Sequence, residues 1–227
     1  TSDLLKIRYI QSIDRSLSKT RIIAILILDR IVGLSSMLLI AGVSSLLLYQ
    51  NFLGKSQGVK SLIILNAVLL LLSILAFSLI FINEKHQNLL ISFVPGERLK
   101  GLAKDFFYLS KYKKNFYYGY FYSVAGQLIS IISFWVVNIP FFESPIDLKL
   151  LMSVTPLGFL ATTIPITPGG VGVGHAAFAV LLGLIGHQNG ASLFNVFWLM
   201  CLMSSLLGVI PFLMFQNKAA SKSSLEK

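Results

Sequence analysis

Two short stretches of this sequence hold residues that could bind a charged ligand, and both lie within strongly apolar sequence. Residues 165–175 read Pro-Ile-Thr-Pro-Gly-Gly-Val-Gly-Val-Gly-His, and Asp29 and Arg30 are adjacent within an apolar run from about residue 22 to residue 50. Proline has no N–H and disfavours helix at the preceding residue, while glycine adopts conformations that other residues avoid. The first stretch should therefore interrupt a helix. A helix that restarts after it would present free N–H groups and the positive end of its dipole, which suit an anion such as phosphate.

The Asp29–Arg30 pair is costly in apolar surroundings, by about 3 kcal/mol for each charge at the centre of a membrane, and so indicates a polar partner. The guanidinium of Arg30 can hold a phosphate through two parallel hydrogen bonds, and Asp29 can orient it. We predict a binding site for an anionic lipid head group, to which Thr167 and His175 add hydrogen bonds. The predicted site residues are Asp29, Arg30, Thr167, Pro168, Gly169, Gly170, Gly172 and His175.

Simpler interpretations stay open for each part of this site. The glycine stretch can be a tight turn between two helices whose glycines pack against a neighbour. Arg30 can extend its charge to the lipid head groups, and His175 can be a packing residue. A purely structural role of this kind would tolerate substitution at Thr167, Pro168 and His175 as long as the helices still packed.

The composition indicates an integral membrane protein. Of the 227 residues 55% are hydrophobic and only 12% are charged, whereas about a quarter of the residues of a soluble domain are charged. The formal net charge of +10 is concentrated beside the apolar runs, and basic loops stay on the cytoplasmic side. We therefore predict a protein of the cell (inner) membrane with both termini cytoplasmic, and contact with membrane lipids rather than nucleic acid.

The pattern of apolar residues predicts an all-α polytopic fold in a single domain, residues 1–227. Leu99, Leu102, Phe106 and Leu109 recur at helical spacing within a basic cytoplasmic loop, 84–119, and residues 1–21 show a similar amphipathic pattern. Both segments are expected to hold helices in the membrane interface. The stretch 146–187 is expected to form a broken, re-entrant pair of short helices. About four full spans are expected at residues 22–50, 59–83, 120–142 and 192–216.

Several kinds of chemistry have no support in the sequence. Cys201 is the single cysteine, which excludes an internal disulfide, and the three histidines do not have the spacing of a metal site. The glycine stretch has no Gly-Lys-Ser/Thr ending, so a nucleotide-binding loop is not expected. A loop of about 35 residues is too short for a soluble transferase domain. We predict no cofactor, no metal and no catalytic residues.

The two stretches also resemble the lysylphosphatidylglycerol synthase transmembrane region, a family of flippase-like membrane proteins. Residues 164–172 are similar to its proline-glycine signature, and residues 29–34 to its acidic-Arg-x-x-Gly-Leu motif. His175 stands where the family most often has Glu. The resemblance covers most of the chain, and it implies that the family's first spans are missing and that the protein moves or handles lipids with polar head groups.

The leading hypothesis is a flippase-like protein that binds or translocates anionic or lipid-linked phospholipid head groups. The alternative is a membrane enzyme, or an accessory subunit, of an aminoacyl- or glycosyl-transfer pathway that modifies lipids. The resemblance implies a possible transferase partner, because such domains are sometimes fused to these membrane regions. A homo-oligomer is compatible with the sequence.

Overall fold

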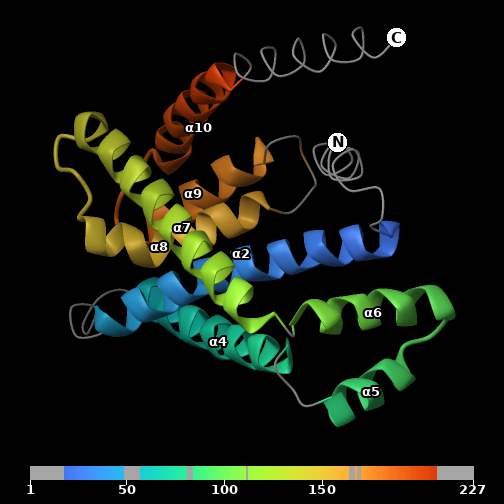
Figure 1. Cartoon of the computed structure of the whole chain (residues 1–227). Coiled ribbons are helices and arrows are strands. Elements are labelled where there is room, and N and C mark those ends of the chain that lie inside the picture. Colours follow the sequence, from blue (N-terminus) through green and yellow to red (C-terminus); the bar gives the residue numbers. More distant parts are fainter. Residues whose placement is uncertain are drawn as a thin grey trace, which may run out of the picture.

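The computed structural model describes residues 18–48, 57–80, 84–110, 112–163, 167 and 170–208, and the regular structure within them is entirely helical (Figure 1). Predictions for residues 1–17 and 209–227 lie outside this part of the chain. The helices are α2 (Lys19–Leu47), α4 (Gln57–Ile80), α5 (Glu84–Phe93), α6 (Glu97–Ser110), α7 (Lys113–Phe141), α8 (Leu148–Thr162), α9 (Val173–Leu184) and α10 (Gly190–Leu207).

Four of these helices, α2, α4, α7 and α10, are long and apolar enough to cross a membrane. They coincide with the four predicted spans, and the all-α polytopic fold is therefore confirmed. The surfaces they leave uncovered are apolar, as a lipid environment requires. Large side chains on these surfaces include Leu71, Leu75, Ile129, Val136, Met203 and Leu206.

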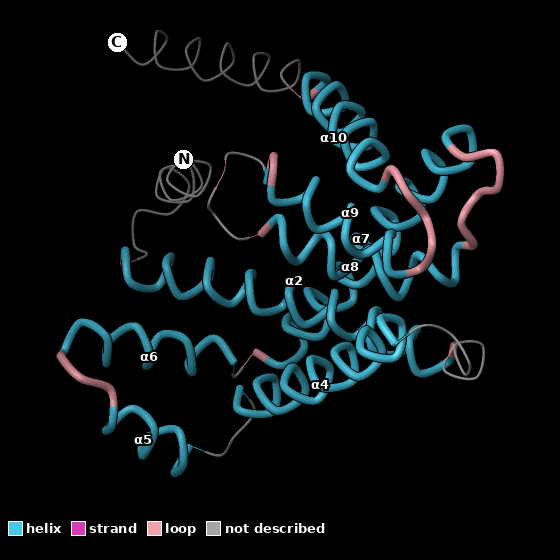
Figure 2. The backbone as a smooth tube through the Cα atoms, turned by 180° about the vertical axis from the view of Figure 1, so that it is seen from behind, coloured by secondary structure: helices cyan, strands magenta, loops and turns pink. Residues whose placement is uncertain are grey.

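Helices α8 and α9 are the predicted pair of short helices. They have 15 and 12 residues, and at about 1.5 Å per residue neither reaches across a hydrocarbon core of about 30 Å. Figures 1 and 2 show that both helices have their outer ends on the side where α2 ends, while the ends of α8 and α9 that flank the break lie toward the start of α2.

An aromatic core holds this pair of short helices in place. Phe178 of α9 is fully buried and stacks between Phe134 of α7 and Phe194 of α10, at ring-centroid distances of 4.8 and 4.9 Å. The rings lie against Gly158 and Gly174, where a Cβ atom would overlap the rings of Phe178 and Phe194. Glycine at these two positions allows the close approach that fixes α8 and α9 against the spans.

Buried polar side chains join α2 directly to α4 and α7, and join α4 to α8. Asn66 of α4 donates hydrogen bonds to the Ser45 hydroxyl of α2 and to the Ser153 carbonyl oxygen of α8. The hydroxyls of Ser36 and Ser123 link α2 to α7 at 2.8 Å. In a lipid environment such bonds contribute about 0.6 to 2 kcal/mol each to helix association. They make α2 the central helix of the bundle.

Two predicted segments differ in detail from the structure. Residues 19–21 belong to α2 and not to an interfacial helix, because the Ser18 hydroxyl accepts a hydrogen bond from the Arg21 N–H and caps the helix there. The basic loop 84–119 consists of α5, α6 and the first turns of α7. The span α7 begins earlier than predicted because Phe116 and Tyr120 pack against Phe77 of α4.

Candidate functional site

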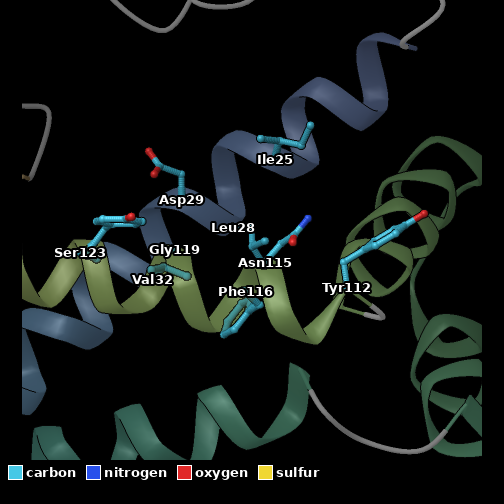
Figure 3. Close-up of a pocket in the computed structure, with 10 residues that line it drawn as sticks. Ile25, Leu28, Asp29, Val32, Tyr112, Asn115, Phe116, Gly119 and Ser123 are labelled. Atoms are coloured by element: carbon cyan, nitrogen blue, oxygen red, sulfur yellow. The ribbon is translucent and has the colours of Figure 1, made fainter.

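A cavity of about 500 Å³ between α2 and α7 is lined by one of the predicted site residues, Asp29. Asp29 lines it from α2, and Asn115 and Ser123 line it from α7. Figure 3 shows Asp29 and Ser123 toward one end of the cavity and Tyr112 at the other. The remaining lining residues are Ile25, Leu28, Val32, Phe116, Gly119 and Tyr122.

The cavity combines one carboxylate with several neutral hydrogen-bonding groups. The Ser123 hydroxyl is held by its bond to Ser36, and the Tyr112 hydroxyl is 3.1 Å from that of Tyr108. The hydrogen bond with Tyr108 raises the pKa of Tyr112 above its usual value, so the phenol stays neutral at physiological pH. A carboxylate with amide and hydroxyl neighbours suits a ligand that carries N–H or O–H donors, such as an amine or a polyol.

Arg30 lies on a different face of α2 from Asp29. Adjacent residues on an α-helix are about 100° apart, whereas residues four apart share a face. Leu34, one turn after Arg30, lines a second cavity of about 850 Å³ between α2, α4, α8 and α9. This cavity is apolar and reaches Thr163 and Val173 on either side of the helix break. Asp29 thus lines the cavity beside α7, whereas Leu34, one turn after Arg30, lines the cavity that reaches the break.

The helix break has the backbone that its glycines permit. Gly170 and Gly172 have φ values of +72° and +88°, which other residues rarely adopt. Gly170 also lies against α8, because a Cβ atom there would come within 2.6 Å of the Thr162 Cβ. Pro168 and Gly169 lie outside the described residues.

Two of the amides that the sequence assigns to a ligand already have partners. The Gly170 N–H donates to the Thr167 carbonyl oxygen, and the Gly172 N–H donates to Nδ1 of His175, each at 3.2 Å. The Thr167 hydroxyl oxygen, in contrast, is buried without a hydrogen-bond partner in the part of the chain that the structure describes.

His175 closes the first turn of α9. Glycine has no side chain with which to cap a helix, so the cap at Gly172 comes from the His175 ring, three residues later. Because Nδ1 accepts this bond, Nε2 carries the proton and donates toward Oδ1 of Asn195, at 3.4 Å. The ring also meets the edge of Phe194. These contacts give His175 a structural role that does not depend on a ligand.

We expect His175→Ala to lower the free energy of unfolding by about 1 kcal/mol, the usual effect of losing a helix cap. His175→Glu should keep most of the stability, since a glutamate at this position also accepts from the cap N–H. Unfolding in mixed micelles, followed by circular dichroism, measures both changes. His86→Ala, at an exposed position of α5, is the control. Equal losses in the alanine and glutamate variants would contradict the capping role.

The structure gathers the predicted residues into two groups and adds new ones. Asp29 lines the α2–α7 cavity, while Thr167, Gly170, Gly172 and His175 lie at the break. The sequence prediction missed Asn115 and Ser123 of α7 and Tyr112, which directly precedes this helix. Their recurrence on one helical face of an apolar span was the signal that could have identified them. In the described residues no cluster of three His, Cys, Asp or Glu side chains could hold a metal ion.

Comparison with known families gives one result. The sequence model described as "Lysylphosphatidylglycerol synthase TM region" matches residues 1–213 of this chain, and it covers every helix described above. Comparison with curated proteins and with solved structures gives no match.

Proposed function

Because the chain belongs to the lysylphosphatidylglycerol synthase TM region family, we propose that it is a flippase-like protein that binds the polar head group of a membrane lipid and carries it across the bilayer. The family and the four apolar helices make it an integral membrane protein of lipid modification or translocation. The distribution of basic residues supports a position in the cell membrane with both termini cytoplasmic.

The observation that carries this proposal is the position of Asp29. An ionisable residue within a span is costly, and such residues mark the paths of substrates and ions. Asp29 lines a cavity of about 500 Å³ together with the Asn115 amide and the Ser123 hydroxyl. A lipid head group with amine or hydroxyl donors would satisfy the carboxylate there, while Leu28, Val32 and the other apolar lining residues contact the adjoining part of the lipid.

The other face of α2 supports a role for Arg30 and the break. The guanidinium suits the phosphate that every phospholipid carries, and the Thr167 hydroxyl, which has no hydrogen-bond partner among the described residues, can donate to the same group. The apolar cavity of about 850 Å³ beyond Leu34 suits acyl chains. Broken helices of this kind are a common means of placing polar sites in transporters.

A vesicle experiment tests the proposal. The purified chain is reconstituted with acyl-labelled fluorescent phosphatidylglycerol or lysylphosphatidylglycerol, and dithionite is added outside. Protein-free vesicles should keep their inner-leaflet fluorescence, while the wild-type chain should expose that label to the reductant. Arg30→Ala should slow this exchange several-fold, because the phosphate loses its partner. The matched control is Lys60→Ala, an exposed cation on α4. A wild-type chain that protects both lipids as well as empty vesicles do would contradict the proposal.

A further inference from the structure

Helices α5 and α6 form a hairpin that the chain holds close to two spans (Figures 1 and 2). Helix α4 ends at Ile80 and α5 begins at Glu84, while α6 ends at Ser110 and α7 begins at Lys113. At about 3.6 Å per residue, these connections reach at most about 14 Å and about 11 Å. The hairpin must therefore lie near the level at which α4 and α7 meet the membrane surface.

Helix α6 is the half of the hairpin that packs against α2. Phe106 packs against the cluster of Val32 and Phe116. The Arg21 side chain lies 3.8 Å from the Asp105 carboxylate, and its guanidinium is 5.2 Å from the centre of the Tyr108 ring. These contacts fix α6 along the first half of α2. The apolar residues at 99–109 predicted an interfacial helix, but one of them, Phe106, contacts other helices of the protein.

Helix α5 has three different faces. Gln87 and Ile91 are buried, and they form the side turned to α6, the helix that α5 packs against. Asn88 and Ser92 form an exposed polar face. The third face is exposed and mainly apolar: the side chains of Leu89, Leu90 and Phe93 are 56%, 40% and 78% exposed, and the exposed His86 lies one turn earlier on the same face. A helix with one protein-facing, one polar and one uncovered apolar face is typical of the membrane interface.

We propose that the Leu89–Leu90–Phe93 face of α5 inserts into the boundary between head groups and acyl chains, in the leaflet where α4 ends and α7 begins. Only a few residues join the hairpin to α4 and α7, two spans whose exposed surfaces are apolar. Leu99, 52% exposed at the start of α6, extends the same apolar surface. The occupant of this face is therefore the bilayer itself.

Insertion of α5 in the membrane interface also affects the α2–α7 cavity. This step rests on the proposed function, in which that cavity binds the head group. Tyr108 of α6 is hydrogen-bonded to Tyr112, and Tyr112 lines one end of the cavity. A hairpin held in the leaflet thus fixes one end of the cavity at the depth of the lipid head groups. Lipids of that leaflet are then the ones placed to enter the site.

Spin labelling tests the membrane seating without any transport assay. In a Cys201→Ser background, Phe93→Cys and Ser92→Cys each carry a nitroxide, and the protein is reconstituted in phosphatidylglycerol–phosphatidylcholine vesicles. Ser92 is the matched control because it neighbours Phe93 in sequence but lies on the polar face. We expect the ratio of oxygen to nickel-chelate accessibility to be several-fold higher for the label at 93 than for the label at 92.

Two outcomes would overturn the inference. Equal access of the nickel chelate to both labels would show that the face is open to water. Protection of the label at 93 from both reagents would show that a second copy or another protein covers it. Neither outcome bears on whether the cavity binds a head group, so a failure here is distinct from a failure of the proposed function.

Discussion

Replacing Gly190 with alanine should destabilise the protein by at least about 3 kcal/mol, the upper range for overpacking a core. A Cβ atom at this position would overlap the carbonyl oxygen of Phe178 and lie 2.8 Å from its carbonyl carbon. The obstacle is backbone, which cannot turn aside as a flexible side chain can. The start of α10 would have to move away from α9, and the stacked rings of Phe178 and Phe194 would separate.

Equilibrium unfolding in mixed micelles, followed by circular dichroism, measures this loss. Gly183→Ala is the matched control, because Gly183 is also helical but a Cβ atom added there would meet no other atom within 4 Å. Alanine is favoured over glycine in a helix by about 0.5 to 1 kcal/mol, so the control should be neutral or slightly more stable. Equal stabilities of the two variants would show that α9 and α10 do not pack as described.

Asp29→Asn should reduce lipid exchange by about ten- to a hundredfold. The substitution keeps the shape of the side chain but removes its charge, and a hydrogen bond to a charged group contributes about 1.5 to 3 kcal/mol. At about 1.4 kcal/mol per tenfold change in rate, this corresponds to the stated range. The effect should be largest for a lipid whose head group carries an ammonium, such as lysylphosphatidylglycerol.

The dithionite experiment with reconstituted vesicles gives the rates. Asp147→Asn is the matched control: Asp147 is exposed beside α8, and its side chain makes no capping hydrogen bond. It should leave the rate unchanged. If Asp29→Asn exchanges both phosphatidylglycerol and lysylphosphatidylglycerol at the wild-type rate, the α2–α7 cavity is not the head-group site.

The sequence predicted the larger elements because their signals are physical and strong. Runs of about 20 apolar residues identify spans, and two prolines with four glycines interrupt a helix whatever its surroundings. The predictions of where α7 starts and of the helices in the 84–119 segment were less accurate. Their boundaries depend on tertiary contacts, such as those of Phe116 and Tyr120 with Phe77, which local sequence does not reveal.

The sequence indicated which residue types could form the candidate site, but not how these residues are arranged relative to one another. Asp29 and Arg30 were treated as one unit because they are adjacent; the structure places Asp29 at the α2–α7 cavity, and the role of Arg30 stays a prediction. The amides of Gly170 and Gly172 were expected to be free, but Thr167 and His175 use them. Local pairing of this kind depends on the exact backbone path through the break. The binding roles of the eight predicted residues stay predictions.

The two faces of α2 make this helix sensitive to its length. Inserting one residue before Asp29 would rotate everything upstream by about 100° relative to everything downstream. The Ser18 cap and the Arg21 contacts with α6 would then no longer align with Asp29 and Ser36 on α7. Natural variants of this protein should therefore change length in the connections between helices, while the interval from Ser18 to Ser36 stays constant.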